Sequence, residues 1–116
     1  MGARLQDKVA IITGAASGIG RGVAELFVSE GAKVIVADMN EEGGKAAVAE
    51  LGANSRFFKC DVTSEDSVKA MVDFAVSEFG KLDILHNNAG AFGARGAVEE
   101  IQVKDFDFTF LNYLGN

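Results

Sequence analysis

Short apolar runs alternate with amphipathic stretches along this chain, a pattern typical of strands and helices in turn. The first run, residues 9–12, is continuous and rich in β-branched side chains, which predicts a strand buried on both faces. Three further runs predict the second, third and fourth strands: residues 34–37, 56–60 and 82–86. A strand, a helix and a strand within about 30 residues form a βαβ unit, whose crossover is nearly always right-handed.

Two helices are predicted between the first three strands. Apolar residues at helical spacing from Ile19 onward predict the first helix, which ends where Gly31 can take the C′ position. Asn40 is placed to cap a second helix over residues 41–51, and Gly52 stops it. Two adjacent glycines inside this second helix weaken the prediction, because glycine is a poor helix former.

The third helix has the clearest pattern. Its apolar stripe lies at i, i+3, i+4, i+7 and i+11, on Val68, Met71, Val72, Ala75 and Phe79. Thr63 and Asp66 match a capping box at its start. A last stripe at i, i+4 and i+8, on Phe106, Phe110 and Leu114, predicts a fourth helix from Val103 onward.

Length and composition indicate one globular domain, since the chain has 116 residues and is 48% hydrophobic. No apolar run approaches the roughly 18 residues of a membrane span, and no signal peptide begins the chain, so a cytoplasmic protein without a membrane partner is expected. The net charge of −6 argues against nucleic acid as a partner. Cys60 is the single cysteine, and no metal-ligand spacing surrounds it. We interpret it as a core residue and expect no metal.

The turn between the first strand and the first helix has the chemistry of an anion site. The first N–H groups of a helix have no partner within it, and the helix dipole places positive charge there. Gly14 and Gly18 leave room for an anion to approach, Gly20 lets the helix lie close to the strands, and Ser17 adds a hydroxyl donor. A glycine cluster can also mark an ordinary turn, and these residues alone leave that alternative open.

Asp38 ends the second strand, 20 residues beyond Gly18. Dinucleotide-binding folds place an acid at this point, where its carboxylate accepts hydrogen bonds from the adenosine ribose. The same carboxylate would repel a 2′-phosphate, and neither Met39 nor Asn40 supplies a compensating positive charge. The residues therefore favour NAD over NADP, with a solvated acid at a strand end as the alternative.

Two motifs give the chain its resemblance to a known family. T-G-x-x-x-G-x-G runs from Thr13 to Gly20, and N-N-A-G follows at residues 87–90, with two βα units between them. In both motifs the chain resembles the short-chain dehydrogenase/reductase family, over its cofactor-binding half only. The resemblance implies an α/β fold, a Rossmann-type doubly wound parallel sheet. Here the sheet would be incomplete, with four strands in the order 3-2-1-4 and flanking helices, forming a single NAD-binding domain over residues 1–116.

The resemblance also implies roles at the cofactor site, with NAD as the cofactor. Its pyrophosphate would be held by the glycine turn, at Gly14, Ser17, Gly18, Ile19 and Gly20. Asp38, with Met39 beside it, would hold the adenosine ribose, Asp61 and Val62 the adenine, and Asn88, Ala89 and Gly90 the inner ribose side. Asp61 can also simply precede the cap of the third helix, and that alternative stays open.

The activity that the resemblance implies is hydride transfer between NAD and an alcohol or ketone substrate. Asn112 matches the active-site asparagine of the family, although Tyr113 departs from the usual aliphatic residue after it, and an ordinary helix asparagine remains an alternative. The family uses a later serine and a Tyr-x-x-x-Lys, but Tyr113 is the only tyrosine and lies three residues before the last. The chain alone is therefore expected to be an inactive, truncated form of an NAD-dependent oxidoreductase that is a homo-oligomer when full length.

Two other functions stay open: a non-catalytic NAD-binding module, and an interaction fragment that works through an open sheet edge. The fourth predicted strand would leave such an edge, which invites pairing with another chain or aggregation. We therefore expect the isolated segment to be marginally stable, or the natural polypeptide to continue beyond Asn116.

Overall fold

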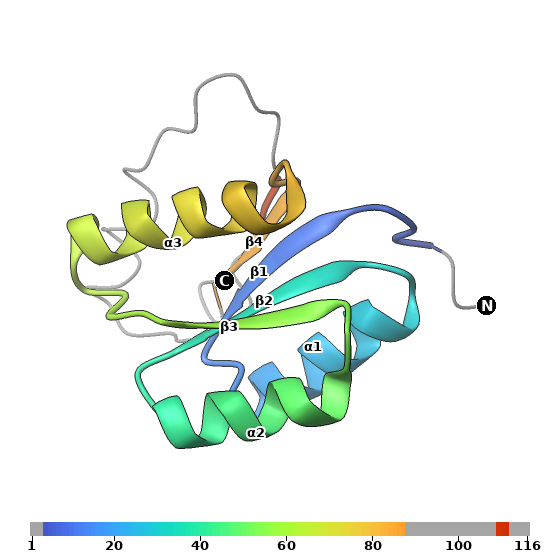
Figure 1. Ribbon diagram of the computed structural model, residues 1–116, viewed down its shortest axis with the longest axis horizontal. Coiled ribbons are helices and arrows are strands. Elements are labelled where there is room, and N and C mark those ends of the chain that lie inside the picture. The colour runs from blue at the N-terminus through green and yellow to red at the C-terminus, as the bar shows by residue number, and fades with distance from the viewer. Residues whose placement is uncertain (1–3, 88–108, 112–116) are drawn as a thin grey trace.

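The computed structural model describes residues 4–87 and 109–111, in which strands and helices alternate (Figure 1). In chain order the elements are β1 (Val9–Thr13), α1 (Gly18–Ser29), β2 (Lys33–Asp38), α2 (Glu41–Leu51), β3 (Ser55–Lys59), α3 (Glu65–Phe79), β4 (Ile84–His86) and β5 (Thr109–Leu111). The first four predicted strands and the first three predicted helices are all present. Their boundaries lie within two residues of the expected ones.

The strands form one parallel sheet in the order β3-β2-β1-β4-β5. In the central pair, Val9 lies opposite Lys33 and Thr13 opposite Ala37. Figure 1 shows α1 and α2 on one face of the sheet and α3 on the other. The expected order 3-2-1-4 is therefore confirmed, with a fifth short strand added beside β4.

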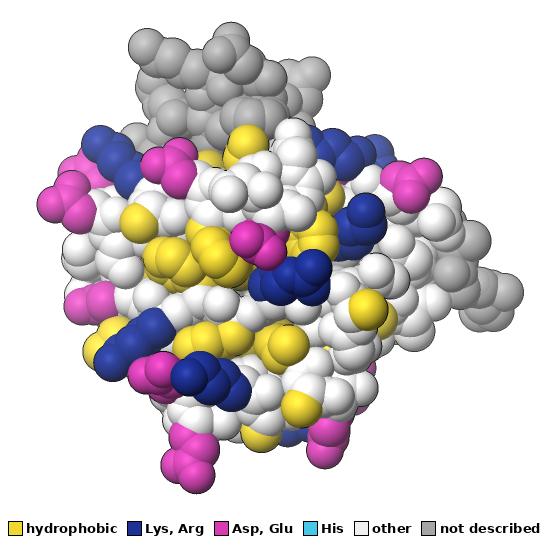
Figure 2. All heavy atoms as spheres, in the orientation of Figure 1, with side chains coloured by type: hydrophobic (Ala, Val, Ile, Leu, Met, Phe, Trp, Pro, Cys, Tyr) yellow, Lys and Arg dark blue, Asp and Glu magenta, His cyan; other side chains and the backbone are white. Residues whose placement is uncertain are grey.

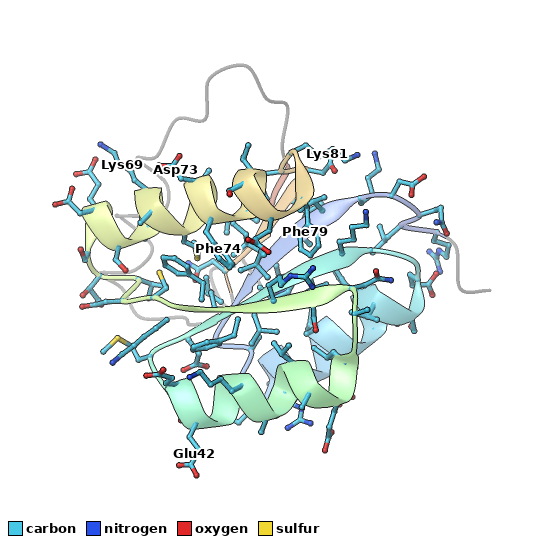
Figure 3. All side chains as sticks on the ribbon, viewed as in Figure 1. Glu42, Lys69, Asp73, Phe74, Phe79 and Lys81 are labelled. Carbon is cyan, nitrogen blue, oxygen red and sulfur yellow. The ribbon has the colours of Figure 1, made fainter. Side chains whose placement is uncertain are left out.

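Two apolar cores lie on the two faces of the sheet, because alternate side chains of a strand point in opposite directions. Ile11 of β1 belongs to the core under α3, whereas Ala10 and Ile12 belong to the core over α1 and α2. The predicted stripe of α3 is buried, apart from its last member, Phe79, which is partly buried. Phe74 and Phe79 lie on the sheet side of α3, while Lys69 and Asp73 project away from it (Figure 3).

Strand β3 is one edge of the sheet, and apolar side chains flank it. Figure 2 shows them in two bands, one between α3 and β3 and the other between β3 and α2. In the upper band the rings of Phe58 and Phe74 pack with centroids 5.1 Å apart. In the lower band the Phe57 ring lies directly under Gly44, where a Cβ atom would overlap its Cε1 and Cδ1 atoms. The glycine that weakens α2 as an isolated helix thus allows its close approach to the sheet.

The helix predicted from Val103 onward is wrong at residues 109–111, which form β5. This strand pairs in parallel with β4, with Thr109 opposite Ile84 and Leu111 opposite His86. A strand at a sheet edge presents a row of unpaired N–H and C=O groups, and pairing satisfies them. A Thr-Phe-Leu run suits a strand as well as a helix, so the available edge decides. The edge of β4 that was expected to stay open is therefore occupied by β5.

The capping box predicted from Thr63 and Asp66 does not form, and the N-cap of the third helix lies one residue later. Ser64, not Thr63, is the N-cap of α3, and its hydroxyl oxygen accepts a hydrogen bond from the Ser67 N–H at 3.2 Å. Thr63 donates both its N–H and its hydroxyl to the Asp61 carboxylate instead. Thr63 and Ser64 can each cap this helix, but the hydrogen bonds from Thr63 to Asp61 leave the N-cap position to Ser64.

Across the described residues, every helix is too short or too polar to cross a membrane.

Candidate functional site

The ends of four parallel strands meet at one edge of the sheet, where hydrogen bonds connect them directly. The Cys60 N–H, after β3, donates to the Asp38 carbonyl at the end of β2 at 3.1 Å. The Thr13 hydroxyl of β1 donates to Asn87 Oδ1, just after β4, at 2.9 Å. In open α/β sheets, ligands bind outside the carboxyl ends of the strands, at the point where the strand order reverses. Here that point lies between β1 and β4.

The turn after β1 is attached to the end of β2 by its first three amides. The N–H groups of Gly14 and Ala15 donate to the Ala37 carbonyl at 2.8 and 3.4 Å, and the Ala16 N–H donates to Asp38 Oδ2 at 3.0 Å. Gly14 has a φ of 66° and Gly18 a φ of 62°, in the left-handed region that favours glycine. The shape of the turn therefore depends on both its glycines and the neighbouring strand.

The next four amides of the turn face no acceptor in the described part of the chain. The first hydrogen bond of α1 runs from the Arg21 N–H to the Ser17 carbonyl at 3.3 Å, so the N–H groups of residues 17–20 precede the helical ladder. Ser17 is the N-cap but makes no side-chain cap bond. A Cβ atom on Gly18 would have no neighbour within 4 Å, so the space in front of this turn is open.

The other two helices begin differently. Asn40 caps α2 by accepting from the Gly43 N–H at 3.0 Å, and Ser64 caps α3. The first turns of α2 and α3 each carry two acidic residues, whereas the first turn of α1 carries none. Acids at a helix N-terminus neutralise the dipole that would otherwise attract an anion. The N-terminus of α1 is thus the one of these three that suits an anionic ligand.

Asp38 lies beside this turn, and both of its carboxylate oxygens accept backbone hydrogen bonds. Oδ2 accepts from Ala16, and Oδ1 accepts from the Asn40 N–H at 3.0 Å. Ile19 and Met39 lie at the same edge, each more than half exposed. The edge therefore presents open amides, a carboxylate and two exposed apolar side chains.

Asp61 follows β3 at the same edge and is held by a local turn. Its Oδ1 accepts from the Thr63 N–H at 2.9 Å and from the Thr63 hydroxyl at 2.6 Å. These hydrogen bonds to the charged form lower the pKa of Asp61, which stays ionised at neutral pH. Val62 beside it is partly buried against the core under α3. Asp61 thus both precedes the cap of α3 and lies at the edge where the carboxyl ends of the strands meet.

The described residues bring together three of the predicted groups: the glycine turn, Asp38 with Met39, and Asp61 with Val62. The other predicted site residues, Asn88, Ala89, Gly90 and Asn112, lie outside the described residues. Sequence reasoning missed the bridge between Thr13 and Asn87. The signal was present, since Thr13 and Asn87 are polar residues at the ends of apolar strands, and Asn87 is fully buried.

Two further side chains at this edge belong to the cores. Burial raises the pKa of the Cys60 thiol, which is fully buried and remains protonated at neutral pH. Burial also lowers the pKa of His86, whose ring meets Phe27 edge-on with centroids 6.1 Å apart. Within residues 4–87 and 109–111, no group of three or more His, Cys, Asp or Glu side chains is arranged to hold a metal ion.

Comparison with known proteins identifies the fold and its family. The family model described as short chain dehydrogenase matches residues 8–115. The chain belongs to the short-chain dehydrogenase family. Its sheet is accordingly a Rossmann-type doubly wound sheet, as expected.

Two solved structures of the short-chain dehydrogenase family resemble the chain closely. A 3-ketoacyl-(acyl-carrier-protein) reductase from Brucella melitensis, complexed with NADH, is 43% identical with a TM-score of 0.69, over 71% of this chain and 34% of that one. A hydroxysteroid dehydrogenase from Escherichia coli is 44% identical with a TM-score of 0.70, over 74% of this chain and 37% of that one.

Two curated relatives are similarly close in sequence. Momilactone A synthase of Oryza sativa subsp. japonica is 56% identical over 91 residues, which are 78% of this chain and 33% of that protein. Tropinone reductase-like 1 of Erythroxylum coca is 47% identical over 107 residues, which are 90% of this chain and 39% of that protein. The chain therefore spans between a third and two fifths of the length of these relatives.

Proposed function

We propose that this chain is the cofactor-binding part of an NAD-dependent oxidoreductase that transfers hydride between the nicotinamide and an alcohol or ketone substrate. The observation that carries the proposal is the row of four open amides at residues 17–20, beside the Asp38 carboxylate. Open amides suit a pyrophosphate, and a carboxylate at the end of β2 suits a ribose diol. The NADH bound to the Brucella reductase supports a nicotinamide dinucleotide as the ligand.

In this proposal the glycine turn holds the pyrophosphate. The N–H groups of Ser17, Gly18, Ile19 and Gly20 donate to its oxygens, and the Ser17 hydroxyl adds a further donor. Gly14 and Gly18 supply the left-handed backbone that aims these groups. Gly20 is buried, which keeps α1 close to the sheet. The turn thus binds an anion through backbone dipoles, so the negative net charge of the chain is no obstacle.

The adenosine half of the ligand lies across the ends of β2 and β3. Asp38 accepts from the ribose hydroxyls and repels a 2′-phosphate, so NAD is preferred over NADP. Met39 lies next to the ribose, Asp61 accepts from the adenine amino group, and Val62 packs by the adenine ring. The exposure of Met39 and the ionised state of Asp61 support these roles.

The nicotinamide half extends toward residues 88–90 and Asn112. Asn88, Ala89 and Gly90 line the inner ribose, and Asn112 belongs to the catalytic set. A bound nicotinamide supplies the hydride acceptor or donor, while the protein orients it and moves protons. Residues 1–116 are proposed to act as one NAD-binding domain, in which Tyr113 adjoins Asn112 and is given no catalytic role.

The buried thiol of Cys60, the single cysteine, is consistent with a reducing compartment and supports a cytoplasmic location. The full-length protein is proposed to act on a small alcohol or ketone as a homo-oligomer.

A calorimetric titration of the chain with NAD and with NADP tests the proposal. Saturable binding of NAD, with much weaker NADP binding, is the expected result. Asp38→Ala should weaken NAD binding, whereas Glu42→Ala is the matched control, because Glu42 projects from α2 into solvent (Figure 3). A folded chain that binds neither dinucleotide would refute the proposal, and equal binding of both would refute the preference for NAD.

A non-catalytic NAD-binding module is the second candidate, because the open amides of residues 17–20 and the Asp38 carboxylate would serve NAD binding without catalysis. It predicts the same affinity for NAD and no turnover of any alcohol by the full-length protein. An interaction fragment acting through β4 has lost its main support, because β5 occupies that edge.

A further inference from the structure

We propose that Asp38 has a second role, as a positioning residue: its carboxylate holds the glycine turn in the shape that leaves the amides of residues 17–20 open. This role does not depend on the ribose, although it rests on the proposed function for its effect on ligand binding. Asp38 then acts on the pyrophosphate through Ala16, as well as touching the adenosine directly.

The amides of the glycine turn divide into attached ones and open ones. Residues 14–16 donate their N–H groups to the end of β2, and only the last of these bonds uses a side chain. Ala16 is 4% exposed and immediately precedes the N-cap Ser17. A buried N–H that loses its acceptor must find another, because an unsatisfied buried donor is costly. Without the carboxylate, the peptide between Ala15 and Ala16 is therefore free to rotate, and the amides that follow lose their fixed orientation.

The other oxygen of the same carboxylate reaches the start of α2. Oδ1 accepts from Asn40, whose own side chain caps α2 through Gly43. A Cβ atom on Gly43 would lie 3.3 Å from the Cβ of Ala16, so α2 begins against the turn. Asp38 thus links the glycine turn to the start of α2, because its carboxylate accepts one hydrogen bond from each.

These two hydrogen bonds leave the carboxylate able to bind a ribose as well. An ionised carboxyl group offers about four acceptor positions, of which the two backbone donors use two. Positioning the turn and binding the ribose are therefore compatible, and a ligand can benefit from both at once.

Asp83 provides a matched control at the opposite end of β1. Its Oδ2 accepts from the Val9 N–H at 2.9 Å, just as Asp38 Oδ2 accepts from Ala16 after the same strand. Removing either carboxylate deletes a charge-assisted bond to the backbone, but only Asp38 faces the glycine turn. Asp83→Ala therefore measures how much the loss of such a hydrogen bond destabilises β1, while the glycine turn keeps its own hydrogen bonds to β2.

The experiment separates the two roles with a ligand that lacks the ribose contact. NAD and its 2′,3′-dideoxyadenosine analogue are titrated into the native chain, Asp38→Ala, Asp38→Asn and Asp83→Ala. We expect Asp38→Ala to weaken the analogue about tenfold, the scale of one charge-assisted hydrogen bond. Asp38→Asn keeps one acceptor oxygen, so its affinity for the analogue should lie between those of the native chain and of Asp38→Ala. Asp83→Ala should bind both ligands as the native chain does.

A structural measurement on the free protein accompanies the titrations. The amide proton of Ala16 should exchange with solvent faster in Asp38→Ala than in the native chain, and at the native rate in Asp83→Ala. Unchanged exchange of this proton would overturn the proposal. So would unchanged or tighter binding of the analogue by Asp38→Ala, which is what simple removal of a negative charge predicts.

These outcomes are distinct from failure of the proposed function. If the native chain binds no NAD, the proposed function fails, whatever the exchange of Ala16 shows. If Asp38→Ala weakens NAD but leaves both the analogue and Ala16 exchange unchanged, Asp38 acts on the ribose alone.

Discussion

Replacing Gly44 with alanine should destabilise the chain, whereas the same replacement at Gly22 should stabilise it. Both glycines lie inside helices, so each change gains up to about 1 kcal/mol of helix propensity. A Cβ atom at Gly22 meets nothing within 4 Å. At Gly44 it overlaps Cε1 and Cδ1 of Phe57 and lies 3.0 Å from Cζ. Either α2 moves away from β3 or the ring leaves its place, and such overpacking costs about 1–3 kcal/mol.

The two variants should therefore differ by about 1–3 kcal/mol in the free energy of unfolding, with Gly44→Ala the less stable. Urea denaturation followed by circular dichroism measures both values. Phe57→Leu removes the ring atoms involved, so adding Gly44→Ala to that background should cost less than in the native chain. Equal stabilities for Gly44→Ala and Gly22→Ala would refute the close packing of α2 on Phe57.

Three further changes are predicted from the same structure. Because burial lowers the pKa of His86, the unfolded chain takes up its proton at a higher pH than the folded one. Stability should be lost as the pH falls below about 6.5, and urea denaturation of a His86→Leu variant should lack this dependence. Ser64→Ala removes the cap bond to Ser67 and should cost about 1 kcal/mol by the same assay, whereas Ser17→Ala, which breaks no cap bond, should cost almost nothing. Gly18→Ala has open space but a φ of 62°, so it should cost about 1–2 kcal/mol and weaken NAD in calorimetry, and an unchanged affinity would contradict the role of this turn.

The elements that local signals determine were predictable from the sequence. Strands β1 and β2 are continuous apolar runs, and both are buried as expected. The bounds of α2 were predicted correctly, because Asn40 and Gly52 mark its two ends with their own side chain and backbone preferences. Local signals were insufficient where two neighbouring residues could take the same role, as Thr63 and Ser64 could both cap α3.

The features that depend on distant partners were not predictable. Residues 109–111 carry a helical spacing, and only the free edge of β4 makes them a strand. For the site, the glycines and the acid could be placed at one edge of the sheet from their order along the chain. The bond between Ala16 and Asp38 could not, because it depends on the register that sets Thr13 opposite Ala37.

The attachment of the glycine turn to β2 makes ligand binding inseparable from strand pairing. The acceptors for the amides of residues 14–16 belong to residues 37 and 38, so the open amides exist only after β1 and β2 have come together. An unfolded or partly paired chain has no such site, and a dinucleotide would bind the native state alone. At a free concentration of one hundred times its dissociation constant, the ligand would add about 2.7 kcal/mol to the free energy of unfolding. The supply of cofactor in a cell would then influence how long each molecule survives proteolysis, in addition to how many are loaded.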